Sequence, residues 1–284
     1  MSLRQDITRL VESIPLADTH EHILEEKLRL EPADGSRLDD FAVLFSHYAD
    51  ADLAVAGMPG RYLGRVVTRG VDWREKWKLI KPHYEAARNT GYMQAVRISV
   101  QRLYGEEEID DSTIDRINEK VKQLIKPGFT RRVIKEIANI DHCQVNSLAG
   151  KVFLETEHPD ILLQDIGTPS LVSDWKDRKL WDEAGVEVKS IGDYHKVIDF
   201  YFDNFADKAV ATKNQMNYAR RLDFDDVGAD DIADVFRRDL KSDSGLSPRE
   251  NKAIQDHLFR ACPSHSGKLA GGSSILCRFA LLVN

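Results

Sequence analysis

The second half of the chain alternates short apolar segments with longer amphipathic ones, and this alternation constrains the fold most strongly. Residues 142–148, 161–166 and 209–213 have the length and composition of buried strands, and 151–154 is a further strand candidate. Between them, aromatic and aliphatic residues recur at intervals of three and four over 194–205, which predicts a helix. Strands that alternate with helices form a parallel sheet with right-handed crossovers. We therefore expect an α/β fold, either an open sheet or a (β/α) barrel.

The first half of the chain has a different pattern of predicted secondary structure, with one strand and many helices. An amphipathic helix is predicted before Pro15, and a short strand is predicted to follow it over 15–22. From about residue 28 to residue 140 the signals are mostly helical, as in the segment 114–125. These observations predict a helical insertion after the first strand.

Composition excludes several classes of partner. The chain has 40 Lys and Arg against 47 Asp and Glu, a net charge of −7, which argues against a nucleic-acid-binding protein. No apolar run reaches the roughly 18–20 residues that a membrane span needs, and the charged N-terminus is unlike a secretory signal. Three widely spaced cysteines favour neither a disulfide framework nor a cysteine-based zinc site. We expect a cytoplasmic globular protein.

The end of the sequence differs from the rest. Its last 28 residues contain no Asp or Glu, although these types make up 47 of the 284 residues. Two interpretations stay open: a final strand after a Ser/Gly-rich loop, or a tail that is not the native continuation of the gene. We treat residues 1–262 as one barrel domain that contains the insertion at about 28–140, and 263–284 as an atypical tail. A strong helix start at Ser247-Pro-Arg-Glu250 predicts a helix that runs to about Cys262.

The segment Asp18-Thr-His20-Glu-His22 is the strongest chemical signal. Side chains at positions i and i+2 of a strand project from one face, so His20 and His22 are expected to point the same way. Two neutral imidazoles that converge in this way can bind one divalent metal ion. The competing interpretation is two polar residues at an exposed strand end.

The pattern Asp18-x-His20-x-His22 at the end of a first strand resembles the amidohydrolase superfamily of metal-dependent (β/α)8-barrel enzymes. The nearer resemblance is to the branch with uronate isomerase-like and decarboxylase-like members. Two further segments are similar to sequences of that branch: Tyr84-x-x-x-Arg88-x-Thr90-Gly-Tyr92 and Ala211-Thr-Lys213-Asn-Gln215-x-x-Tyr218-x-Arg220-x-Leu222.

The resemblance implies a TIM-type barrel, or the first part of one, with a role for several residues. His20 and His22 would bind the metal, zinc or alternatively manganese. Lys213 matches a strand-end lysine that many members carry in carbamylated form as a bridge between two metal ions. Lys213 and Asp18, the nearest carboxylate, are the candidate catalytic residues. Arg88 and Tyr92 are candidate contacts for the carboxylate of a substrate.

The resemblance also has gaps. The superfamily places histidines after its fifth and sixth strands and an aspartate after its eighth, but only His257 and His265 follow Lys213, and no aspartate follows Asp256. We predict a metal-dependent hydrolase that attacks a C–N or C–O bond of a small molecule through an activated water. The alternatives are a uronate isomerase-like or decarboxylase-like activity, and a truncated barrel without catalysis. Whether the chain forms a homo-oligomer is left open.

Overall fold

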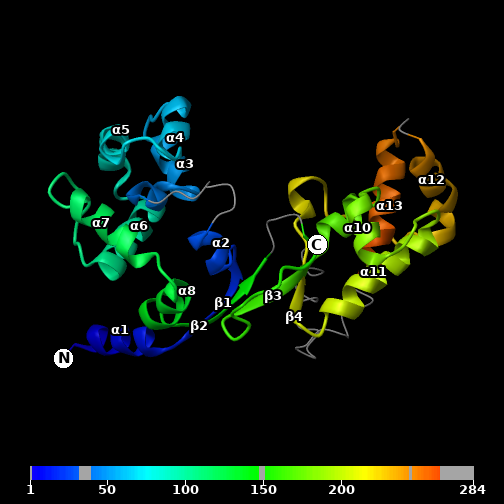
Figure 1. Ribbon diagram of the computed structural model, residues 1–284, viewed down its shortest axis with the longest axis horizontal. Helices are drawn as coiled ribbons and strands as arrows, with labels where there is room; N and C mark the ends of the chain where they lie inside the picture. The colour runs from blue at the N-terminus through cyan, green and yellow to red at the C-terminus, as the bar shows by residue number, and fades with distance from the viewer. Residues whose placement is uncertain (1, 32–39, 147–150, 243–244, 263–284) are drawn as a thin grey trace. The chain divides into compact units, whose positions relative to one another are not determined.

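A computed structural model describes residues 2–31, 40–146, 151–242 and 245–262 of the chain, which form two compact units (Figure 1). The helical unit comprises residues 1–15 and 24–140, and the sheet unit comprises residues 16–23 and 141–284. The predicted tail at 263–284 lies outside the described residues, so the predicted domain boundary at 262 stays a prediction.

Four parallel strands in consecutive order form the sheet. They are β1 (Leu16–Glu21), β2 (Ile140–Val145), β3 (Leu162–Gly167) and β4 (Ala209–Lys213). The register places Cys143 opposite Leu162, and Gly167 opposite Lys213. An open doubly wound sheet reverses its strand order at a switch point, whereas here each strand neighbours the next in sequence. This order is that of a barrel segment, which decides between the two sheet types left open by the sequence.

Helices on the outside of the sheet unit supply most of its core. Aromatic and aliphatic side chains at helical spacing on α11 (Ile191–Phe205) are buried with Ile166 of β3 and Ala209 of β4. They include Tyr194, Ile198 and Tyr201. The other helices are α9 (Pro169–Ser173), α10 (Arg178–Ala184), α12 (Ala229–Lys241) and α13 (Pro248–Ala261), with a short 3-10 turn at Met216–Tyr218.

The helical unit confirms the predicted insertion after the first strand. Its helices are α1 (Leu3–Ser13), α2 (Glu26–Leu30), α3 (Tyr48–Val55), α4 (Gly60–Val66), α5 (Trp73–Ala87), α6 (Gly91–Tyr104), α7 (Ile114–Leu124) and α8 (Phe129–Arg131), with a 3-10 helix at Phe41–Phe45 and a π-helix at Arg132–Ile137. The unit has its own core, which includes Phe45, Ile80 and Ile117. Inside it, the buried Lys76 Nζ lies 2.6 Å from Asp40 Oδ2.

Three details of the predicted elements need correction. Residues 151–154 are not a strand, since the carbonyl of Val152 accepts one hydrogen bond from the amide of Gly167 without a continued ladder. The first strand ends at Glu21, one residue before His22. The predicted second strand ends at Val145, and residues 147–148 lie outside the described part.

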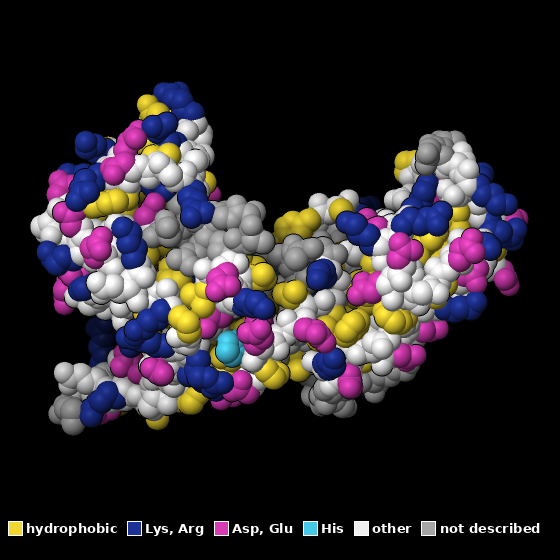
Figure 2. All heavy atoms as spheres, in the orientation of Figure 1, with side chains coloured by type: hydrophobic (Ala, Val, Ile, Leu, Met, Phe, Trp, Pro, Cys, Tyr) yellow, Lys and Arg dark blue, Asp and Glu magenta, His cyan; other side chains and the backbone are white. Residues whose placement is uncertain are grey.

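Figure 2 shows Lys and Arg side chains interspersed with Asp and Glu side chains over the face that it presents. In the described ranges no helix combines the length and apolar composition that crossing a membrane requires.

Candidate metal site

The end of β1 brings the two predicted histidines together. His20 Nε2 lies 3.2 Å from His22 Nε2, and the two rings are nearly perpendicular with their centroids 4.9 Å apart. This arrangement follows from the i, i+2 spacing, since alternate residues of an extended segment project to one side. His20 is exposed and His22 is partly buried.

The separation of the two Nε2 atoms fits a shared metal ion. Imidazole nitrogens bind zinc at about 2.0–2.1 Å, so two nitrogens 3.2 Å apart would subtend roughly 100° at one ion, close to a tetrahedral angle. Within the described residues no group of three or more His, Cys, Asp or Glu side chains is arranged to hold a metal. The described part of the site therefore offers two candidate ligands.

Lys213 belongs to the same cluster, as the sequence predicts. It ends β4, and its Nζ lies 2.8 Å from Nδ1 of His20. If Lys213 is a charged ammonium, it donates to Nδ1 of His20, and the proton of the neutral imidazole lies on Nε2. A metal ion bound at Nε2 requires that proton on Nδ1 instead. In that case Nδ1 donates the hydrogen bond and Lys213 must be a neutral amine to accept it. Burial lowers the pKa of Lys213, and the charge of Asp165 acts in the opposite direction. Burial thus favours the neutral amine that metal binding at His20 needs.

Asp165 was not predicted from the sequence. This carboxylate lies on β3 and is 1% exposed. Its Oδ1 accepts a hydrogen bond of 2.9 Å from Gln144 Nε2, while its Oδ2 meets no donor among the described residues. Burial raises the pKa of Asp165 to about 6, against the opposing effects of Gln144 and Lys213. The sequence signal is the polar pair Gln164-Asp165 within an otherwise apolar strand.

Asp18 contacts the backbone of the histidine segment. Its Oδ1 accepts a hydrogen bond of 3.1 Å from the amide of His20. Burial raises the pKa of the adjacent Glu21, and the hydrogen bond and charge of Asp18 raise it further. These contacts hold the end of the strand, and the catalytic role of Asp18 stays a prediction.

Arg88 and Tyr92 belong to the helical unit. Arg88 Nη2 lies 3.1 Å from Glu108 Oε2, and Tyr92 stacks on Tyr48 with the ring centroids 5.4 Å apart. Their role as substrate contacts stays a prediction.

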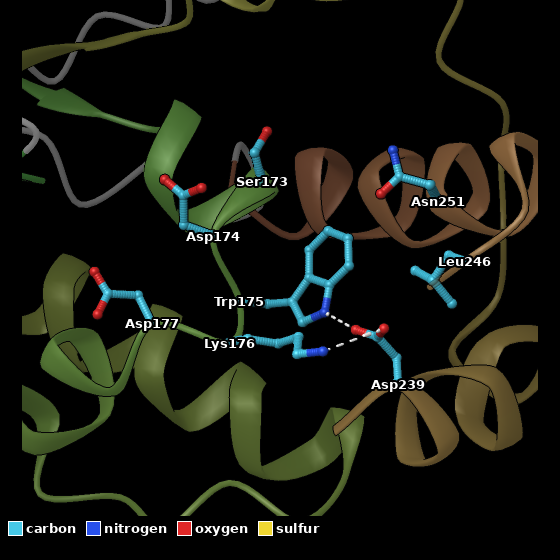
Figure 3. Close-up of a pocket in the computed structure, with 8 residues that line it drawn as sticks. All are labelled: Ser173, Asp174, Trp175, Lys176, Asp177, Asp239, Leu246 and Asn251. Carbon is cyan, nitrogen blue, oxygen red and sulfur yellow. Dashed lines mark hydrogen bonds and ion pairs between the residues drawn. The ribbon is translucent and has the colours of Figure 1, made fainter. Parts of the chain in front are cut away.

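A hollow of about 510 Å³ in the sheet unit is lined by residues outside the predicted site (Figure 3). The carboxylate of Asp239 points at Trp175 and Lys176 there, accepting a hydrogen bond of 2.9 Å from the indole and lying 3.5 Å from the ammonium. In this hollow the carboxylate of Asp239 is already bound by Trp175 and Lys176. The predicted chemistry lies instead at the ends of β1 and β4.

Comparison with known proteins identifies the fold. No protein-family model matches the chain, and no curated protein sequence matches it either. The chain is similar in structure to uronate isomerase from Thermotoga maritima, with a TM-score of 0.71 and 14% sequence identity. The match covers 94% of this chain but 61% of that structure's chain. The likeness confirms the predicted α/β TIM-type barrel, of which this chain spans a part.

Proposed function

We propose that this chain binds a divalent metal ion through His20 and His22 and is part of an amidohydrolase-type enzyme that isomerises a uronate sugar acid. The convergence of the two imidazoles at 3.2 Å at the end of the first strand is the observation that carries the proposal. In TIM-type barrels the catalytic groups gather at the carboxyl ends of the strands, which is where these histidines and Lys213 lie. The likeness to a structure described as uronate isomerase supports the choice of substrate class.

The two imidazoles present suit zinc, because imidazole is a preferred ligand of zinc. A bound divalent ion supplies positive charge that polarises a substrate oxygen. His20 presents Nε2 to the ion when its proton lies on Nδ1, and Lys213 as a neutral amine accepts the hydrogen bond from that atom. Lys213 therefore fixes the orientation of His20. Asp165, with a pKa near 6, holds a proton in the same region of the sheet at mildly acidic pH.

Hydrolysis of a C–N or C–O bond is the second candidate, and one observation favours it. The lowered pKa of Lys213 raises the population of its neutral amine, the form that reacts with carbon dioxide to give a carbamate. A carbamylated lysine would add oxygen ligands beside the two histidines and allow a second metal ion.

The test is turnover by the purified chain reconstituted with zinc or manganese. One set of reactions contains aldohexuronates and is followed by ketose formation, and a second set contains amides and esters. We expect conversion of a uronate that is lost in His22→Ala and kept in His142→Ala, a partly exposed histidine of β2. Conversion of amides or esters alone would favour the hydrolase. A chain that binds metal but converts neither class would support the non-catalytic alternative and contradict the proposal.

A further inference from the structure

A hydrogen bond between two histidines joins the outer helices α11 and α13 of the sheet unit. Nε2 of His195 on α11 lies 2.8 Å from Nε2 of His257 on α13, and the ring centroids are 5.0 Å apart, so the two nitrogens face each other. Both side chains are partly buried. The contact connects residues 62 positions apart in the sequence, and neither histidine belongs to the site at the ends of β1 and β4.

A third group fixes the positions of the protons in this pair. Nδ1 of His257 lies 2.8 Å from the carbonyl oxygen of Val227. A carbonyl oxygen only accepts hydrogen bonds, so Nδ1 of His257 carries a proton, and Nε2 of the neutral ring is an acceptor. His195 therefore donates from its Nε2. The contact between the two helices requires that Nε2 of His257 carries no proton.

The hydrogen bond is compatible with one added proton but not with two. When His195 gains a proton at Nδ1, its Nε2 still donates to His257, and the positive charge of the donor strengthens the bond. When His257 is protonated as well, every ring nitrogen of the pair is a donor. Two N–H groups would then point at each other across 2.8 Å, and the two positive charges would repel. The doubly protonated rings must move apart.

The charged groups around the pair compensate for one added proton. Among the described residues, Asp199 of α11, Asp226 ahead of α12 and Arg260 of α13 line the hollow of about 450 Å³ that contains both histidines. Arg260 Nε lies 3.9 Å from Asp226 Oδ1, so the charges of these two groups largely balance. Asp199 lies one helical turn after His195 and supplies one further negative charge. The second proton on the pair therefore has no counter-charge from these residues.

We propose that the contact between His195 and His257 is a pH-sensitive latch, which fixes α13 to α11 in neutral solution and opens in mildly acidic solution. A free histidine has a pKa of about 6.5, so above this pH the closed and open forms bind the same number of protons. Below it, the open form binds one proton more, and each further pH unit shifts the balance toward the open form by up to about tenfold. The apolar core beneath the pair, which includes Ile198, Ile254 and Leu258, does not titrate, so the opening is local.

Hydrogen exchange of the full chain at pH 8 and pH 5 tests the latch. The natural chain is compared with His195→Gln at each pH, so that the intrinsic effect of pH on amide exchange cancels. The glutamine amide can donate to Nε2 of a neutral His257 and accept from the protonated ring, so the variant keeps a contact at both pH values. Between pH 8 and pH 5, the protection of the α13 amides in the natural chain should fall about tenfold relative to the variant.

The matched control is His83→Gln on α5, where Nδ1 contacts the carbonyl of Ala56. It should leave the protection of α13 equal to that of the natural chain at both pH values. Nitrogen NMR of the natural chain at pH 8 is a second readout that needs no variant, and it should show a proton on Nε2 of His195 but none on Nε2 of His257. A protection ratio between the natural chain and His195→Gln that is the same at pH 8 and pH 5, or a proton on Nε2 of His257 at pH 8, would overturn the proposal.

Discussion

Asp165 is a charged residue in a position that opposes its ionised form. Its carboxylate is 1% exposed and has one hydrogen-bond donor, Gln144, so burial raises its pKa from 3.8 to about 6. When folding raises the pKa of a carboxyl group, the protonated group stabilises the folded chain at pH values below its pKa in the unfolded chain. This stabilisation is lost as the pH rises through the pKa of the group in the folded chain. For Asp165 the window is therefore pH 4 to 6.

We expect Asp165→Asn to remove this pH dependence. We compare the free energy of unfolding of the natural chain with that of the variant at each pH. Between pH 4 and pH 7.5 the value for the natural chain should fall by up to about 3 kcal/mol relative to the variant, because the pKa of Asp165 differs by roughly two units between the folded and unfolded chain. Urea denaturation of both proteins at the two pH values measures it. Asp182→Asn, at an exposed position of α10, serves as the control. A constant difference between the natural chain and Asp165→Asn would show that burial does not govern this carboxylate.

At the scale of single elements, α13 shows how local sequence sets a boundary. Ser247 Oγ accepts a hydrogen bond of 3.3 Å from the amide of Glu250, and Glu250 Oε2 accepts one of 2.9 Å from the amide of Ser247. These reciprocal bonds satisfy two amides that the first turn of a helix leaves without partners.

Ser247→Ala is expected to lower the free energy of unfolding of the sheet unit by about 1 kcal/mol, because it removes the acceptor for the Glu250 amide. Chemical denaturation followed by circular dichroism measures the loss. Ser247→Thr keeps a hydroxyl acceptor and should retain most of the stability. Equal losses in the two variants would mean that the hydroxyl bond does not stabilise the helix.

Features encoded by neighbouring residues were predictable from the sequence. The helices α7, α11 and α13 and the strand β4 follow from periodicity and end signals within each segment. The position of Asp165 beside Gln144 depends on the register between β2 and β3, which no local pattern encodes. The same holds for the pairing of His195 with His257 across 62 positions. The prediction of a strand at 151–154 was wrong, because a short apolar run does not reveal whether a partner strand lies beside it.

At the scale of the whole chain, two separate cores stabilise the two units. The helical unit buries side chains such as Ile117 and Phe45, and the sheet unit buries Tyr201 and Ile254. A domain with its own core can open without the unfolding of another.

We expect Ile117→Ala, at a fully buried position of α7, to destabilise the helical unit by about 2–5 kcal/mol. Hydrogen exchange should show faster exchange in α3, α5 and α7, with little change in β3 and α11. Glu119→Ala, at an exposed position of α7, should leave exchange unchanged. Equal acceleration in both units would show that they open together.

Metal binding at the end of the first strand is the central claim, and zinc stoichiometry tests it directly. The chain is loaded with zinc, desalted and measured by elemental analysis. We predict about one zinc per chain, falling below about 0.2 when His20→Ala and His22→Ala are added, because two imidazoles supply the described ligands. The same zinc content with and without the two histidines would contradict the account.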